Sequence, residues 1–172
     1  MKARPRVPSY LLFNTIKMKL KLLIIGLLFI NCANKAQEVE PVYTYEVSTA
    51  LQPYVFDYMA TLDKYEIEYK KQSFIVVFDS DIMRTPLVGR AQGMFNDELV
   101  YVRIDPREWG YLTPKQRKHL IFHELSHDIF NVLHTEDVEL MKPSLPSDVK
   151  AFAMDIDKEI IQLMKYIKNG NK

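Results

Sequence analysis

The chain has 172 residues, of which 48% are hydrophobic, and its 23 basic and 22 acidic side chains leave a formal net charge of +1. This length suits one globular domain with a single core and is too short for two good ones. A charge so close to zero gives no argument for a nucleic-acid partner, and we expect none.

Residues 1–32 have the layout of a secretory signal peptide. Three lysines at positions 17, 19 and 21 precede an apolar run at 22–30 that is too short to span a bilayer as a stable helix. The only cysteine of the chain, Cys32, follows this run. Its place resembles the bacterial lipobox, whose cysteine is acylated, although Asn31 stands where Gly, Ala or Ser is usual. Two alternatives stay open: a lipid anchor at Cys32, or an ordinary signal peptide that contains a cysteine.

The polar residues 33–42 are interpreted as a tether to a domain that spans residues 43–172. Acylation of Cys32 would anchor this domain to a membrane in a bacterial cell envelope, and a plain signal peptide would make it secreted. We expect the domain to be a monomer.

Sequence patterns predict that this domain is α+β, with a small mixed sheet. Apolar residues at helical spacing predict a first helix over 53–65. A continuous β-branched and aromatic run predicts a buried strand over 74–78. Two further strands are expected at 88–95 and 98–104.

The next helix has clear start signals. Thr113 is a good N-cap, Pro114 suits the first helical position, and Gln116 can close a capping box with Thr113. Apolar residues continue the helical pattern to about Phe130.

The end of the chain is predicted to form a single helix, capped by Ser147 and ended by Asn169 and Gly170. Its apolar residues would form one stripe along the helix. They are Val149, Phe152, Ala153, Ile156, Ile160, Leu163, Met164 and Ile167.

The helix that begins at Thr113 contains the pattern H-E-x-x-H, formed by His123, Glu124 and His127. Residues four apart share one helix face, so His123 and His127 can present two imidazoles to one ion. Glu124 flanks the same position and can act as general base toward a water that the metal activates. The pattern on a well-capped helix therefore predicts a site for one zinc ion, with two ligands and a base.

A catalytic zinc takes a third protein ligand, for which His134 is the first choice. On a continuous helix His134 would lie ~10 Å from His127, too far to reach the same ion. The helix must therefore end between them, and Asn131 is the expected hinge because Asn tolerates the left-handed conformation. Acidic residues remain alternatives for this ligand, namely Asp137, Glu139, Asp155, Asp157 and Glu159.

The fourth histidine, His119, shares a helix face with His123. Residues 119 and 127 would lie ~12 Å apart, so His119, His123 and His127 cannot all bind one ion. We interpret His119 as a packing residue or as a support for a ligand.

These residues, followed by Leu140 and Met141, resemble the metzincin clan of zincins. That clan has the motif H-E-x-x-H-x-x-G-x-x-H and, further on, a tight turn with a methionine beneath the metal. The chain is also similar to small metzincin-like lipoproteins of bacteria, and the resemblance covers about residues 98–145. It departs at Phe130, where the metzincin glycine would stand, and His134 is displaced by one position. The resemblance implies a zincin-like fold, with His134 as third ligand and Met141 as the residue of the Met-turn.

The resemblance also implies a zinc metallopeptidase that acts on peptides or proteins. The strand at 88–95 would bind the substrate backbone by strand addition. The candidates for stabilising charge on the substrate are Tyr101, Arg103 and Tyr111. Two other functions stay open: an envelope lipoprotein in which zinc has no catalytic role, and a zinc hydrolase that acts on another bond, such as a cell-wall amide.

Overall fold

The structure, a computed structural model, describes residues 43–85, 87–95 and 98–170. Tyr43–Lys172 forms one compact unit. The predicted signal peptide, Cys32 and the tether lie outside the described residues. Within these ranges, no helix is both long enough and apolar enough to cross a membrane.

The described strands form one four-stranded mixed sheet in the order β1-β2-β4-β3. β1 (Tyr45–Val47) pairs in parallel with β2 (Ser73–Phe78), which pairs in parallel with β4 (Leu99–Ile104). β3 (Gly89–Ala91) is antiparallel to β4 and forms one edge of the sheet. The chain is therefore an α+β protein with a small mixed sheet, as its sequence predicts.

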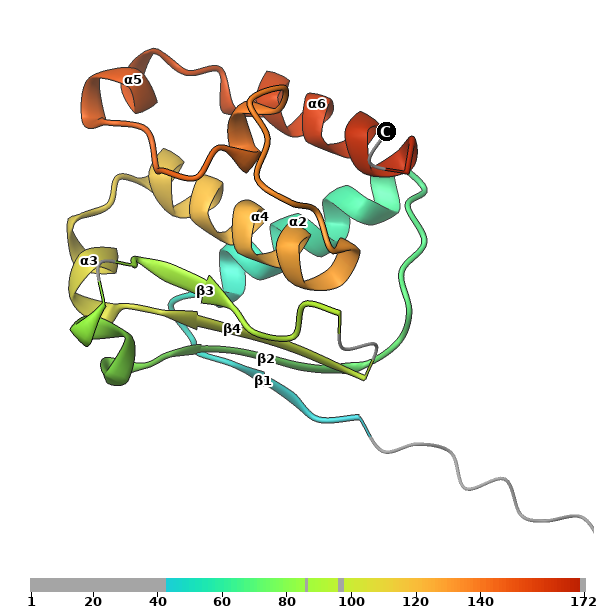
Figure 1. The fold of residues 1–172 in the computed structure, drawn as a ribbon, viewed down its shortest axis with the longest axis horizontal. Coiled ribbons are helices and arrows are strands. Elements are labelled where there is room, and N and C mark those ends of the chain that lie inside the picture. Colours follow the sequence, from blue (N-terminus) through green and yellow to red (C-terminus); the bar gives the residue numbers. More distant parts are fainter. Residues whose placement is uncertain (1–42, 86, 96–97, 171–172) are drawn as a thin grey trace, which may run out of the picture. The chain divides into compact units, whose positions relative to one another are not determined.

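The three long helices of the described residues lie on one side of this sheet (Figure 1). They are α2 (Gln52–Lys64), α4 (Pro114–Phe130) and α6 (Ile156–Lys168). α4 packs against β3 and β4 on one side and against α2 and α6 on the others, so it is the central element of the core.

Burial alternates along the strands because the helices cover one face of the sheet. In β2, Phe74 and Val76 are buried, whereas Ile75 and Val77 are only partly so. The buried strand predicted at 74–78 is therefore found, but its buried residues alternate with partly buried ones.

The back of α4 is held against α2 by specific contacts. The Tyr58 hydroxyl and the Ser126 hydroxyl lie within hydrogen-bonding distance, 3.1 Å apart, and both are buried. The Tyr58 ring also packs edge-on against Phe122, with 5.0 Å between the ring centroids. Lys118 pairs with Asp57 at 2.8 Å. These contacts fix which face of α4 turns away from α2.

The predicted C-terminal helix is in fact two helices, α5 (Asp148–Ala153) and α6. The Asp155 side chain accepts a hydrogen bond from Lys158 N–H and so starts a new helix. Lys115 of α4 donates to the carbonyl oxygens of Phe152 and Met154, where α5 ends.

The prediction of a single apolar stripe is therefore wrong for the residues of α5. Val149 and Phe152 of α5 are 82% and 88% exposed. From Ile160 onward the predicted stripe is buried.

Several short elements were not predicted from the sequence. They are β1, the 3-10 helices η1 (Ser80–Arg84) and η2 (Glu139–Met141), and α3 (Pro106–Tyr111). α3 carried a readable signal, because Asp105 caps it and Pro106 occupies its first turn. The edge strand, expected at 88–95, extends only over β3.

Candidate metal centre

α4 begins and ends as its sequence predicts. Thr113 accepts a hydrogen bond from Gln116 N–H, and the Gln116 side chain bonds back to Thr113 N–H, which completes the capping box. At the other end Asn131 adopts the left-handed conformation, with φ 54° and ψ 30°. The chain therefore leaves the helix axis directly after Phe130.

The turn at Asn131 brings the following loop back beside α4. Thr135 N–H donates to the carbonyl oxygen of Met141 at 3.0 Å, which closes the loop on itself. Met141 is fully buried in the core. The loop thus holds His134, which is exposed, next to the two histidines of the helix.

His123, His127 and His134 converge on one point. Their potential ligand atoms all lie within 4.8 Å of one another. His123 Nε2 is 2.9 Å from His127 Nε2 and 3.2 Å from His134 Nε2. Three nitrogens bound to one ion at 2.0–2.1 Å in tetrahedral geometry would lie about 3.3 Å apart. The three histidines are therefore close enough to hold one metal ion.

The orientation of the two helical rings supports this assignment. His123 Nδ1 bonds to the Leu140 carbonyl at 2.7 Å, and His127 Nδ1 bonds to the Val132 carbonyl. A carbonyl oxygen only accepts, so each Nδ1 carries the hydrogen and each Nε2 of a neutral ring has a free lone pair. Two lone pairs that face each other across 2.9 Å repel, and a cation between them removes the repulsion.

Both helical rings are neutral near pH 7. Burial, reinforced by the neighbouring His127, lowers the pKa of His123 to about 3. Burial also lowers the pKa of His127. Because a metal binds the neutral imidazole, neither ring has to lose a proton before it can coordinate.

Glu124 is buried in the wall of the same cleft. Burial raises its pKa to about 7, while a hydrogen bond from the backbone N–H of Ala91 in β3 opposes the rise. A carboxyl group with a pKa near neutrality can both accept and release a proton at pH 7.

Gly89 allows β3 to approach Glu124 closely. A Cβ atom at this position would lie 2.8 Å from Glu124 Oε1 and 2.9 Å from Leu120 Cδ1. A side chain at this position would force Glu124 or Leu120 to shift, so Gly89 allows the carboxylate to lie this close to the edge strand.

Asp128 is a buried residue next to His127 that sequence reasoning missed, and its charge adds to the rise in the pKa of Glu124. Its Oδ2 accepts hydrogen bonds from Gly93 N–H at 2.7 Å and Tyr101 N–H at 3.2 Å. These bonds join α4 to the segment after β3 and to β4. The readable signal was an acidic residue directly after His127 and before the apolar Ile129 and Phe130.

The acidic alternatives for the third ligand do not join the histidine cluster. Glu139 pairs instead with Lys142 and Lys150, and Asp157 pairs with Lys118. Asp155 caps α6. Among the described residues, the potential ligand group consists of the three histidines alone.

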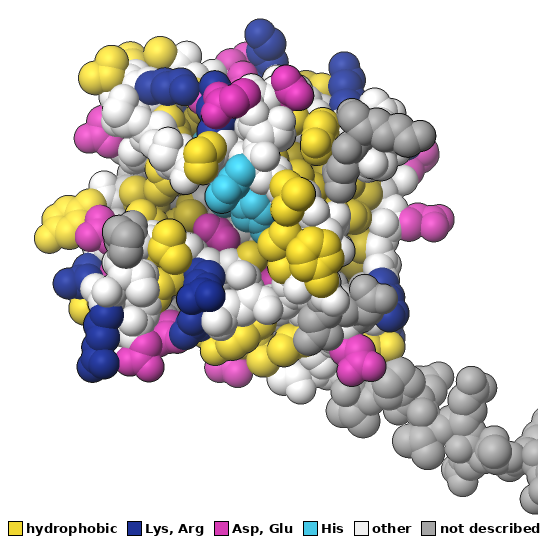
Figure 2. Space-filling model, viewed as in Figure 1, with side chains coloured by type: hydrophobic (Ala, Val, Ile, Leu, Met, Phe, Trp, Pro, Cys, Tyr) yellow, Lys and Arg dark blue, Asp and Glu magenta, His cyan; other side chains and the backbone are white. Residues whose placement is uncertain are grey.

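The histidines lie in a cleft of about 610 Å³. Residues 87–91 form one wall and residues 142–145 form part of the other, with the histidine face of α4 between them. In Figure 2 the histidine side chains lie in a hollow at the centre of the face, with hydrophobic side chains around them. A peptide-sized ligand could therefore reach the three histidines from solvent.

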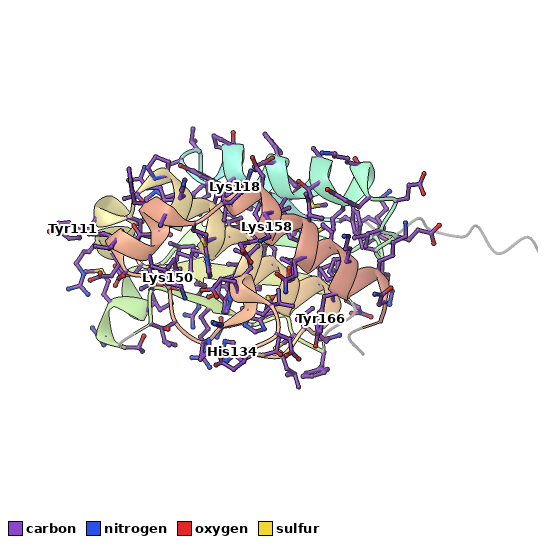
Figure 3. The ribbon with its side chains drawn as sticks, turned by 90° about the horizontal axis from the view of Figure 1, so that it is seen from above. Tyr111, Lys118, His134, Lys150, Lys158 and Tyr166 are labelled. Atoms are coloured by element: carbon purple, nitrogen blue, oxygen red, sulfur yellow. The ribbon has the colours of Figure 1, made fainter. Side chains whose placement is uncertain are left out.

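The three residues suggested for stabilising charge on the substrate do not line this cleft. Tyr101 and Arg103 alternate along β4 with the buried residues that face the helices, so they lie on the other face of the sheet. Tyr111 is 84% exposed, and Figure 3 shows it at the outer edge of the molecule, far from His134. This prediction is wrong.

His119 lies one turn before His123 and is not part of the cluster. The two rings stack at an angle of 28°, with 6.2 Å between their centroids. His119 is buried, and it forms part of the cleft wall.

No known protein family matches the chain, and no curated protein or solved structure is significantly similar to it.

Proposed function

We propose that this protein is a zinc-dependent peptidase with a metzincin-like site. The observation that carries the proposal is the convergence of three Nε2 atoms, from His123, His127 and His134, beside the buried carboxyl group of Glu124. Two of the three rings are oriented by backbone carbonyls, so these two would need little reorientation to bind a metal.

The donor set favours zinc over harder cations. Three imidazole nitrogens are typical of catalytic zinc, whereas magnesium and calcium prefer oxygen ligands. A three-ligand site also leaves room for water or substrate. When bound, zinc would supply Lewis-acid chemistry, which makes water nucleophilic near pH 7 and polarises a carbonyl group.

Glu124 is the residue that would move the proton. Its carboxylate would take the proton from the attacking water and then deliver it to the nitrogen of the breaking peptide bond. The pKa of about 7 suits both halves of this transfer. Burial in the cleft wall would also keep bulk water from competing for the proton.

The edge strand β3 would hold the substrate. Ala91 N–H donates toward Glu124, so the edge of β3 that is not paired with β4 faces the cleft. An extended peptide that adds to this edge would run past Glu124 with its backbone hydrogen-bonded to the enzyme. Substrate binding by β3 thus gives a reason for the close approach that Gly89 allows.

The metzincin assignment is supported by the turn after α4. The glycine expected at position 130 is replaced by Phe130, and Asn131 takes the left-handed conformation one residue later. This shift matches the displacement of His134 by one residue. Met141 is buried next to Leu140, whose carbonyl orients His123, as a residue beneath the metal should be.

The location in the cell envelope is proposed on the signal-peptide pattern and Cys32 alone. A lipid anchor at Cys32 would place the domain at a membrane surface, where its substrates would be peptides or proteins of the envelope.

The variant Glu124→Ala tests the proposal. We expect wild type and variant to bind one zinc ion each, and hydrolysis of a peptide library to fall about 10²–10⁴-fold in the variant. Zinc content by mass spectrometry and cleavage by fluorescence are the measurements. Glu68→Ala, which removes an exposed carboxylate between α2 and β2, is the matched control and should change neither.

A wild-type protein that binds one zinc ion and cleaves no peptide would overturn the peptidase proposal. The non-catalytic envelope lipoprotein and the hydrolase of another bond would then be the remaining functions.

A further inference from the structure

The cleft continues past the metal centre toward the beginning of α4, where it reaches His119. This side chain is only 1% exposed, yet it lines the cleft together with Leu120 of the same helix. Val88 before β3 and Leu145 before α5 lie on the two sides, and both are half-buried. The result is a pocket with apolar walls and an imidazole at its end.

Neither ring nitrogen of His119 has a hydrogen-bond partner among the described residues. A neutral imidazole has one donor and one acceptor, and leaving both unpaired in a buried place is unfavourable. His123 and His127, one and two turns further along α4, each have a carbonyl partner for Nδ1. An apolar residue would fill the place of His119 without this cost, so a ligand that completes its hydrogen bonds would be favoured.

Charges of both signs act on His119. Glu139 and Lys150 act on its imidazole in opposite senses, and burial lowers its pKa to about 4. Lys142, at the rim of the cleft, is already paired with Glu139 at 2.9 Å and with Glu136 at 3.5 Å. His119 itself therefore offers neutral hydrogen-bonding groups and no charge to receive an ionised ligand.

We propose that this pocket makes His119 a specificity-determining residue, which selects substrates with a long, uncharged, hydrogen-bonding side chain next to the cleaved bond. Glutamine and tyrosine fit this description. The proposal rests on the proposed peptidase function and names the substrate class of that site.

The length and the polarity of the substrate side chain together limit which residues can bond to His119. His119 lies one helical turn, about 5 Å, from His123, so serine or asparagine would be too short to touch it from a backbone held at the metal. Methionine and phenylalanine would fill the pocket but leave the imidazole unpaired. Glutamate and lysine would lose hydration against a neutral imidazole that supplies no opposite charge.

Matched peptides test this selection. Two pairs differ only in the residue next to the cleaved bond: glutamine against methionine, and tyrosine against phenylalanine. We expect the wild-type kcat/KM to favour the polar member of each pair by about tenfold or more. In His119→Leu the ratio should fall to within about threefold of one, through loss of activity toward the polar peptides. His119→Gln, which keeps a donor and an acceptor, should retain part of the preference.

Binding supplies a readout that does not depend on hydrolysis. Peptide hydroxamates with the same four side chains are titrated into the zinc-loaded wild type, Glu124→Ala and His119→Leu. We expect the first two proteins to bind the polar hydroxamates more tightly and His119→Leu to lose the difference. Tyr111→Leu, far from the cleft, is the control and should leave every ratio unchanged.

The outcomes separate this proposal from the proposed function. Discrimination between hydroxamates without any peptide cleavage would support the pocket and overturn the peptidase. Peptide cleavage without the polar preference, or a preference that survives in His119→Leu, would overturn the pocket alone. A His119→Leu protein that folds but loses zinc would show that His119 supports the metal, and would also overturn the pocket. If the wild type neither cleaves peptides nor binds hydroxamates, both proposals are overturned.

Discussion

The two ends of the cleft use the same residue type on the same helix in different ways. At the metal end, the Nδ1 atoms of His123 and His127 are held by the carbonyl oxygens of Leu140 and Val132. At the other end, His119 has no such acceptor among the described residues. The loop after α4 supplies both carbonyls, so the loop, and not the helix, distinguishes the two clustered histidines from His119.

Helical spacing alone therefore does not determine which histidines on α4 can share a metal ion. His119 is four residues before His123, just as His127 is four residues after it. By spacing alone, His119 and His127 are equally good partners for His123. Only the pair with oriented rings has Nε2 lone pairs that meet.

The largest expected effect comes from substituting histidines at the two ends of the cleft and comparing zinc binding. We expect His123→Ala to weaken zinc binding more than about 10²-fold, since loss of a group that merely orients a ligand already costs about 10–100-fold. His134→Ala should behave in the same way. His119→Leu should change zinc affinity less than about threefold. Competition with a chromogenic chelator measures all three, and equal effects at His119 and His123 would refute the distinction.

The wall opposite the loop can be tested at Gly89. In Gly89→Ala the new methyl group would collide with Glu124 and Leu120, which should displace the carboxylate and reduce kcat/KM by at least about tenfold. Zinc affinity should change much less, because no metal ligand is touched.

Gly110→Ala is the matched control for this substitution, since a Cβ atom at Gly110 meets nothing within 4 Å. A Gly89→Ala enzyme with full activity would contradict the role given to the close approach of β3.

The left-handed turn at Asn131 connects α4 to the loop that carries His134. Asn131→Ala should lower the free energy of unfolding by about 1–2 kcal/mol, because alanine is strained in the left-handed region. Asn131→Gly should recover much of this loss. Both variants lack the bond from Phe95 N–H to Asn131 Oδ1, so their difference isolates the backbone term. Urea unfolding measures it, and equal stability of the two variants would argue against strain at this turn.

The smallest expected effect is on stability, through the ion pairs of Glu139 with Lys142 and Lys150 near His119. Hydrogen bonding to Lys150 and then to Lys142 lowers the pKa of Glu139 below its usual 4.5. Its stabilising contribution is therefore complete above that pH and disappears as the pH falls through the lower pKa of the folded state. The advantage of wild type over Glu139→Gln, below about 1 kcal/mol, should shrink between pH 6 and pH 3.

Urea unfolding of metal-free protein checks this dependence. In a Lys150→Met background the advantage should be smaller at every pH. An advantage that grows as the pH falls would contradict the assignment.

Elements whose signals are local were predicted well. The boundaries of α4 follow from Thr113, Gln116 and Asn131, whose side chains or backbone act within a few residues of their own position. β2 and β4 were found within one residue because β-branched runs are strong signals. The split between α5 and α6 was missed although Asp155 is a local cap of α6; Lys115, distant in sequence, also binds the carbonyls where α5 ends.

For the site, the sequence by itself determined the H-E-x-x-H face and the need for a turn before His134, since both follow from helical geometry. Tertiary structure decided that the turn brings His134 to the cluster and that carbonyls of the loop orient the two helical rings. It also decided that Asp128 joins α4 to the sheet, that Gly89 admits Glu124, and that His119 ends a pocket. These contacts join residues far apart in the chain, so they depend on how the elements pack and not on any local pattern.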